Sequence, residues 1–307
     1  MLHYRSLDNI NLGPSFLTIG SFDGVHIGHQ AIIHELTGKA HAVGELAVVL
    51  TFYPHPAVVL GKRQAPLYLT SPEERAHIFG SLGVDFVITY PFTPETANLS
   101  YEGFLILVKN HINFKHLIVG YDFALGKNRT GNVEALQTLG AQLKYTLDVL
   151  PPVHGDGGPV SSSQVRMSLL KGDVREVRRL LGRPFRINGK VIHGDGRGHT
   201  IGIPTANLSI WGEQALPAPG VYACLVEVQG RFWKAVTNIG YRPTFLDTPM
   251  DLQVETHLLD FDANLYGEVI ALSFEDRLRA EIKFTGVNQL LEQINQDITT
   301  ARNILTI

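Results

Sequence analysis

Short apolar segments alternate with helix-like segments over the first half of the chain, and this alternation limits the fold most. The predicted strands cover residues 15–20, 46–52, 84–90, 116–120 and 143–149. Helices are predicted to begin at the capping sequence around Ser71, after Ser100 and near Asn132. Continuous apolar strands separated by helices are typical of a parallel sheet covered on both faces. We therefore expect a doubly wound α/β fold for this half.

From about residue 183 the pattern changes, because strand-like segments follow one another without helices between them. They cover residues 185–192, 221–228, 232–238, 252–258, 268–274 and 278–284, with a tight turn at Gly230. Such spacing predicts an antiparallel sheet or small barrel. A final helix is expected to present one apolar face, made by Val287, Leu290, Leu291, Ile294 and Ile298. We expect two domains, residues 1–182 and 183–307.

The segment from Gly20 to His29 joins the first predicted strand to the first helix. Such a junction aims free backbone N–H groups and the positive end of a helix at one spot, where an anion is stabilised. His26 and His29 are three residues apart, and imidazoles can donate hydrogen bonds to phosphate oxygens. We favour this interpretation over two solvated histidines in a turn. The residues assigned here to ATP phosphates are Gly20, Phe22, Asp23, Gly24 and Gly28.

The spacing of the glycines excludes two better-known phosphate loops. The segment from Gly120 to Lys127 has one residue too many for a Walker loop and is followed by Asn128. Gly194 and Gly196 begin a dinucleotide pattern but lead to His199 instead of a third glycine.

Two further loops follow the predicted strands 46–52 and 116–120. One holds His55 between two prolines, and the other contains Asp122. Each loop alone is usually a structural turn. Ligands gather beyond the carboxyl ends of parallel strands, however, and three loops at one sheet edge favour a ligand site.

A helix is predicted to open at Ser161-Ser162-Ser163-Gln164-Val165-Arg166 and to continue to Leu181. Hydroxyls at a helix start are ordinarily caps. A cation in the first turn opposes the helix dipole, and an arriving phosphate would remove that conflict. We therefore favour anion binding by Arg166 over a solvated arginine.

In the second half, residues 194–202 form a glycine-rich stretch that leads into Pro204-Thr205-Ala206-Asn207. A hydroxyl and an amide oxygen at this spacing suit Mg²⁺, which takes its other ligands from water and phosphates. Residues 252–258 alternate, so Glu255 and His257 lie on the face opposite Val254. Alone, that alternation indicates only a core face and a wet face.

The composition bounds the partners. The chain has 307 residues, a net charge of −3 and 44% hydrophobic residues, so no overall basic field would attract nucleic acid. The single cysteine, Cys224, is expected in the core. Residues 1–11 are too polar for a signal peptide, and no apolar run is long enough for a bilayer. We expect a cytoplasmic location, small-molecule substrates, no nucleic-acid or membrane partner, and a weak homo-oligomer.

Taken together and in this order, these stretches resemble the bacterial bifunctional riboflavin kinase/FMN adenylyltransferase family, also called FAD synthetase. The resemblance rests on residues 20–30, 51–56, 120–131, 161–166, 181–185, 202–208, 220–223, 237–245, 255–262, 265–267 and 283–284. It implies that a Rossmann-like nucleotidyltransferase domain, residues 1–182, transfers AMP from ATP to FMN. It also implies that a barrel, residues 183–307, transfers the γ-phosphate of ATP to riboflavin. Both reactions would need Mg²⁺.

Individual roles follow from the resemblance, position by position. It implies that His26, His29 and Arg166 are catalytic in adenylylation, with Ser163 on the phosphates and Asp122 near the site. In the barrel, Gly202, Thr205 and Asn207 would bind ATP, the last two through the metal, and Glu255 would take the proton from the ribityl hydroxyl. The flavin contacts are assigned to His55, Pro56, Asn238 and Arg242.

The chain departs from the family pattern at several positions, including Ala280 before Glu281, which is interpreted as structural. Ser163 replaces a usual Thr but keeps the hydroxyl, whereas His199 replaces an Arg and Ile203 replaces a common Phe in the kinase half. A second hypothesis is therefore that only the adenylyltransferase half is fully active. A third, a non-catalytic flavin- or nucleotide-binding regulator, would require loss of reactive groups such as His29 and Glu255, which are present.

Overall fold

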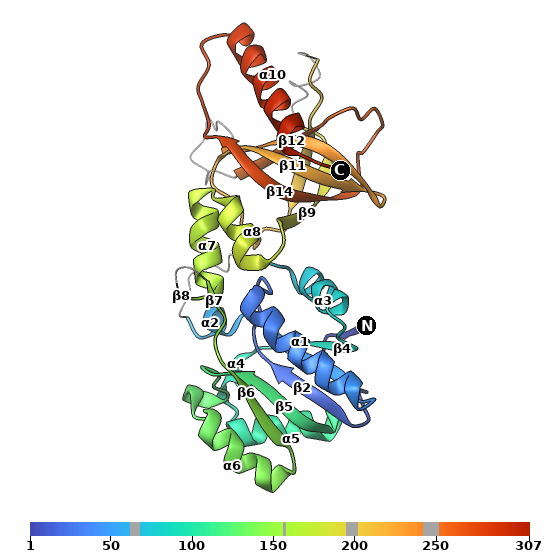
Figure 1. Cartoon of the computed structure of the whole chain (residues 1–307), viewed down its shortest axis with the longest axis vertical. Coiled ribbons are helices and arrows are strands. Elements are labelled where there is room, and N and C mark those ends of the chain that lie inside the picture. The colour runs from blue at the N-terminus through green and yellow to red at the C-terminus, as the bar shows by residue number, and fades with distance from the viewer. Residues whose placement is uncertain (62–67, 156–157, 195–201, 242–251) are drawn as a thin grey trace. The chain divides into compact units, whose positions relative to one another are not determined.

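The computed structural model describes residues 1–61, 68–155, 158–194, 202–241 and 252–307. It divides into two compact units, Met1–Ser162 and Ser163–Ile307, each described here by itself. The first unit is a parallel α/β domain, and the second contains a closed antiparallel barrel and a long C-terminal helix (Figure 1). The predicted fold class is confirmed.

The sheet of the first unit has six parallel strands in the order β1-β4-β3-β2-β5-β6. Their bounds are β1 Leu2–Tyr4, β2 Ser15–Ile19, β3 Leu46–Tyr53, β4 Phe86–Pro91, β5 Phe114–Gly120 and β6 Thr146–Leu150. All five predicted strands are present, and β1 is an additional short edge strand. β6 begins later than predicted because Leu143 ends a helix and Lys144 takes the left-handed conformation after it.

Helices cover both faces of this sheet. They are α1 Ile27–Ala42, α2 Pro56–Val59, α3 Pro72–Ser81, α4 Pro94–Asn98, α5 Tyr101–Ile112 and α6 Val133–Leu143, with a 3₁₀ turn at Lys127–Arg129. Ser71, Ser100 and Asn132 cap α3, α5 and α6 as predicted. One core cluster includes α1 and α3 and the other includes α5 and α6. Burial from both sides explains why the strands are continuously apolar.

The helix predicted over residues 161–181 is in fact two helices, α7 Ser162–Lys171 and α8 Val174–Leu181. Gly172 has a φ of +73°, and the Asp173 carboxylate accepts the Glu176 N–H at 3.0 Å. A left-handed glycine ends one helix and an aspartate caps the next. The single-helix prediction was therefore wrong, and the Gly-Asp pair was the signal against it.

The second unit contains a closed barrel with the strand order β10-β13-β12-β11-β14-β9, in which β9 pairs again with β10. Its strands are β9 Phe185–Ile192, β10 Ala206–Ile210, β11 Gly220–Val228, β12 Arg231–Tyr241, β13 Leu252–Leu258 and β14 Val269–Arg279. The turn at Gly230 is confirmed, with a φ of +78°. The prediction of two strands at 268–274 and 278–284 was wrong, because these segments contribute one strand, β14, which ends at Arg279. The strand β10 was missed.

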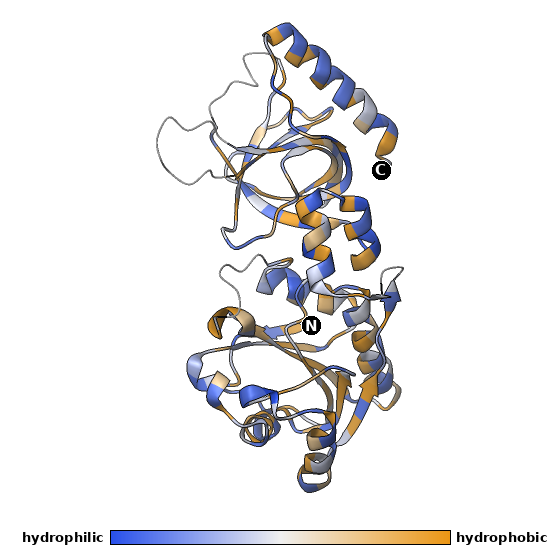
Figure 2. Cartoon of the chain, turned by 90° about the vertical axis from the view of Figure 1, so that its left-hand side faces the viewer, coloured by the Kyte–Doolittle hydropathy of each residue, from blue (hydrophilic) through white to orange (hydrophobic). Residues whose placement is uncertain are grey.

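The last helix, α10 Val287–Ile304, is most buried against the barrel at its C-terminal end. Ala301 and Leu305 are buried against Val221 and Val236. Toward its N-terminus Val287 is 57% exposed, and hydrophilic residues occur along the whole helix (Figure 2). Across the described residues, no helix combines the length and apolar character that a bilayer crossing would need.

Candidate active sites

His26 and His29 lie together at the start of α1. His26 is the N-cap residue, and its Nδ1 accepts the backbone N–H of His29 at 3.3 Å. The two rings stack with centroids 3.6 Å apart and an interplanar angle of 20°. Because Nδ1 of His26 accepts a hydrogen bond, the proton of the neutral ring is on Nε2. A Cβ on Gly28 would lie 3.1 Å from the His26 ring, so this glycine leaves room for the imidazole.

The surroundings of His29 favour its neutral form. Burial lowers the pKa of His29 well below its usual value, and the neighbouring His26 and Arg75 lower it further. The Phe22 ring packs edge-on against His29, with centroids 5.2 Å apart. Negative charge arriving beside His29 would oppose all three effects and favour the imidazolium.

The Asp23 carboxylate holds the loop in place. It is 1% exposed and accepts the N–H groups of Leu69, at 3.0 and 3.1 Å, and Thr70, at 3.2 Å. The backbone carbonyl of Asp23 accepts the Ser162 hydroxyl at 2.8 Å. These bonds position the loop, whereas a direct contact of Asp23 with phosphate stays a prediction.

The backbone of this loop is tightly constrained. Gly24 has a φ of +81°, and a Cβ there would lie 2.7 Å from Cδ1 of Leu69. A Cβ on Gly20 would lie 2.9 Å from the Phe22 ring. Phe22 and Val25 also have positive φ values, 48° and 42°, which are costly for side chains of this size. Backbone strain of this kind clusters at ligand sites.

Arg75 supports the loop from α3 and was missed from the sequence. Its side chain is fully buried, donates to the Ser21 carbonyl and lies 3.3 Å from Oγ1 of Thr51. Asp23 is a nearby opposite charge. The available signal was its position in the helix: Arg75 occurs four residues before Phe79, on the apolar face.

His55 and Pro56 form the start of α2. Nδ1 of His55 accepts the Ala57 N–H at 3.0 Å, and the His55 N–H donates to the Tyr68 hydroxyl at 2.6 Å. Asp122 is exposed just after β5. Near these loops is a cavity of about 530 Å³. Its wall is made by Phe52, Val59, Leu60, Phe92, Pro94, Phe104, Leu125 and residues 96–99 and 126–129. His55, Pro56 and Asp122 are not part of that wall.

Ser163 and Arg166 belong to α7, in the second unit. Ser163 is exposed and Arg166 is half-buried, three residues later and therefore on the same side of the helix. Their participation in adenylylation stays a prediction.

In the barrel, three predicted residues lie side by side on adjacent strands. Asn207 of β10 is directly opposite Glu255 of β13, and Glu255 is directly opposite Asn238 of β12. Opposite residues in a sheet point to the same face, with Cβ atoms about 5 Å apart. Glu255 thus has an amide side chain on each side.

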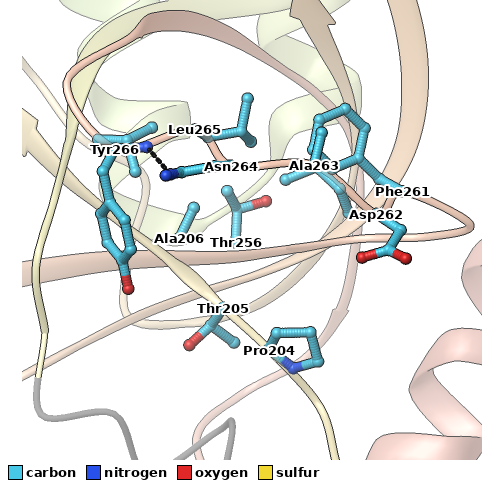
Figure 3. Close-up of a pocket in the computed structure, with 12 residues that line it drawn as sticks. Pro204, Thr205, Ala206, Thr256, Phe261, Asp262, Ala263, Asn264, Leu265 and Tyr266 are labelled. Atoms are coloured by element: carbon cyan, nitrogen blue, oxygen red, sulfur yellow. Dashed lines mark hydrogen bonds between the residues drawn. The ribbon is translucent and has the colours of Figure 1, made fainter.

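Two cavities meet at Thr205. One, of about 360 Å³, is lined by Thr205, Asn238, Glu255 and His257, with Leu290 and Ile294 of α10 among its apolar residues. The other, of about 270 Å³, has Pro204 and Thr205 on one side and residues 261–266 on the other (Figure 3). Gly202 is exposed nearby in the chain with a φ of +77°.

The donor set near Glu255 fits Mg²⁺. Thr205 and Asn207 supply a hydroxyl and an amide oxygen, and a Cβ on Gly194 would lie only 2.1 Å from the Asn207 amide nitrogen. The chain backbone therefore packs directly on that amide. Within the described ranges no three His, Cys, Asp or Glu side chains converge as a metal cluster. Mg²⁺ held through one or two protein oxygens and substrate phosphates does not need such a cluster.

Sequence reasoning missed three further polar residues of this 360 Å³ cavity, Arg279, Glu281 and Asp297. A Cβ on Gly240 would lie 2.2 Å from Oε1 of Glu281. Arg279 makes a partly buried ion pair with Asp297 of α10, with its Nη2 2.8 Å from Oδ2. Arg242 and His199 lie outside the described residues.

Comparison with known families assigns the two halves to a class. The FAD synthetase family matches residues 9–164, and the riboflavin kinase family matches residues 181–305. The protein is thus a transferase with one domain of each kind. More particularly, the chain belongs to the bifunctional riboflavin kinase/FMN adenylyltransferase family.

Similar proteins of that name span almost the whole chain. The Bacillus subtilis protein is 37% identical, covering 96% of this chain and 94% of its own length. The Pseudomonas fluorescens protein is 39% identical, and the match covers 93% of this chain and 91% of that protein. A solved structure described as a macrolide-efflux protein from Streptococcus pneumoniae is 31% identical, with a TM-score of 0.89 and 98% of each chain covered.

Proposed function

We propose that the protein makes FMN and FAD from riboflavin and ATP. The barrel half phosphorylates riboflavin, and the α/β half transfers AMP to FMN and releases pyrophosphate. The observation that carries this proposal is that each unit has its own reactive group: the stacked His26 and His29 in one, and Glu255 between two amides in the other.

In the kinase half, Glu255 accepts the proton of the ribityl hydroxyl as its oxygen attacks the γ-phosphorus and ADP leaves. Thr205 and Asn207 would hold the Mg²⁺ of Mg·ATP, which would supply positive charge beside the phosphates. The apolar residues of the larger cavity suit a flavin ring, and Asn238 supplies a polar contact. The smaller cavity, on the other side of Thr205, takes the nucleotide. Gly202 and Arg242 are further proposed contacts.

In the adenylyltransferase half, an FMN phosphate oxygen attacks the α-phosphorus of ATP, and the bond to pyrophosphate breaks. Nε2–H of His26 and the His29 ring donate to the phosphates, where the N-terminus of α1 adds its positive end. The cavity lined by Phe52, Val59 and Leu60 receives the flavin ring beside His55 and Pro56. Asp122, Ser163 and Arg166 are further proposed contacts of the substrates.

The proposed functional halves are residues 1–182 and 183–307, although contacts group α7 and α8 with the barrel. We also propose a cytoplasmic place of action on small-molecule substrates, with no nucleic-acid or membrane partner and a weak homo-oligomer.

One experiment tests the proposal against its alternatives: the protein is incubated with riboflavin and Mg·ATP, and the flavins are separated by chromatography. Formation of FMN and FAD supports the bifunctional enzyme. Unchanged riboflavin, with FAD formed from supplied FMN, would leave only the adenylyltransferase half active. Binding without conversion of either flavin would indicate a regulator.

A further inference from the structure

His257 connects the strand of Glu255 to the segment of Thr205. Nδ1 of His257 lies 2.7 Å from the backbone oxygen of Pro204. A carbonyl oxygen can only accept, so Nδ1 carries the hydrogen and donates it. The bond fixes both the ring orientation and the tautomer, because the other ring nitrogen is then the acceptor of the neutral form.

The position of this bond matters because of the strand register. Asn207 is opposite Glu255 and Ala206 is opposite Thr256, so one further step along the pair brings Thr205 beside His257. Pro204 has no N–H to extend the ladder. The imidazole therefore anchors the chain through the Pro204 carbonyl, immediately before the two residues proposed to hold Mg·ATP. Both Thr205 and His257 line the same cavity as Glu255.

We propose that His257 is a positioning residue of the riboflavin kinase reaction: through Pro204 it fixes Thr205 and Asn207 at a set distance from Glu255. This inference rests on the proposed role of Thr205 and Asn207 in holding Mg·ATP. Loss of the bond lets Thr205 move relative to Glu255. This movement weakens the binding of Mg·ATP more than the binding of riboflavin. Residues that orient metal ligands through one hydrogen bond act in this way in other metal sites.

The test compares His257→Ala with His257→Asn in the full chain. The Asn amide nitrogen takes the place of Nδ1 and can donate to the Pro204 carbonyl, whereas Ala cannot. We expect Ala to raise the Mg·ATP KM and the Mg²⁺ needed for half-maximal kinase rate about 10-fold or more. The riboflavin KM should change much less, and Asn should restore most of the loss.

Two controls accompany these variants. Gln253→Ala changes the same face of β13 two residues before Glu255, away from Pro204, and should leave the kinase constants near wild type. Adenylylation of supplied FMN by each preparation reports that the chain is folded. If His257→Ala also fails to adenylylate FMN, His257→Asn is compared with His257→Gln. The amide nitrogen of Gln reaches the place of Nε2 instead of Nδ1. Wild-type behaviour of Asn but not Gln supports the inference, and the reverse overturns it.

Thr205→Ala and Asn207→Ala separate the inference from the function on which it rests. If neither changes the Mg·ATP dependence, the proposed ATP site is wrong. If they do change it while His257→Ala resembles wild type, or while Ala and Asn are equally impaired, the positioning role of His257 is overturned.

Discussion

Nδ1 of His26 accepts the backbone N–H of His29, and the same two residues stack their rings 3.6 Å apart. One histidine thus caps the helix that carries the other. The arrangement brings two imidazoles and a helix N-terminus to one point, which suits a site for a polyphosphate. It also places a half-buried His29 where protonation is unfavourable, because its pKa is lowered.

The pKa of His29 makes stability depend on pH. Since this pKa is lowered in the folded chain, the unfolded chain binds a proton below its usual pKa of about 6.5 that the folded chain does not bind. The free energy of unfolding should therefore fall as the pH decreases below that value, by at most about 1.4 kcal/mol per pH unit for this residue. Urea unfolding at about pH 5.5 and 7.5 measures the slope. His29→Gln should flatten it, and an unchanged slope would contradict the assignment.

Replacing His29 by Ala should stop the pathway at FMN. The variant loses one donor to the phosphates, a loss that typically costs about 10²–10³ in rate. FMN formation from riboflavin should stay at the wild-type rate, since the barrel has its own ATP site. Chromatography of the products after incubation with riboflavin and Mg·ATP shows whether FMN accumulates. Loss of both steps in a folded variant would mean that the two halves do not divide the reactions as proposed.

Glu255→Gln should impair the kinase reaction and leave adenylylation intact. Without a proton acceptor the kinase rate should fall about 10²–10⁴-fold, while supplied FMN is still converted to FAD. Glu281→Gln is the matched control, because Glu281 lines the same cavity. A larger loss for Glu281→Gln than for Glu255→Gln would show that the wrong carboxylate has been assigned as the base.

Gly24 has close neighbours where a Cβ would lie, whereas Gly44 has none. Both have positive φ, +81° and +71°, but a Cβ on Gly24 would meet Leu69 at 2.7 Å and one on Gly44 would meet nothing within 4 Å. Gly44→Ala should therefore lose about 1 kcal/mol of unfolding free energy through its backbone alone. Gly24→Ala should lose more and also impair adenylylation. Equal losses in urea unfolding would rule out the contact with Leu69 as the cause.

The sequence predicts the parallel sheet well because burial on both faces leaves an unbroken apolar run, as in β3. β10 was missed although Ala206, Leu208 and Ile210 alternate with Asn207 and Ser209, because the segment has only five residues, and it is held in place by pairing with β9 and β13. The likeness to a known family pointed to Glu255, Asn207 and Asn238 one by one. Their alignment in a row depends on barrel register, which local pattern does not determine.

The burial of Arg75 is a second feature that the local sequence pattern does not determine. A charged residue on an apolar helix face can be excluded from water only when acceptors from elsewhere meet it. Here these are the Ser21 carbonyl, just after β2, and the Thr51 hydroxyl, within β3. Nothing within α3 itself specifies them, so the tertiary fold alone identifies Arg75 as a support of the histidine loop.

Arg75→Met should therefore destabilise the first unit and impair adenylylation together. The substitution keeps much of the side-chain volume but removes both donations and leaves Asp23 without its neighbouring positive charge. Breaking a buried charge arrangement typically costs about 3–5 kcal/mol. Arg5→Met is the matched control, because Arg5 pairs with Glu73 of the same helix at the surface, where a pair contributes about 0–1 kcal/mol. Urea unfolding and FAD formation from supplied FMN measure the two effects. Equal stability of the two variants would show that Arg75 does not hold the loop, whereas retained kinase activity in Arg75→Met would confine the damage to the adenylyltransferase half.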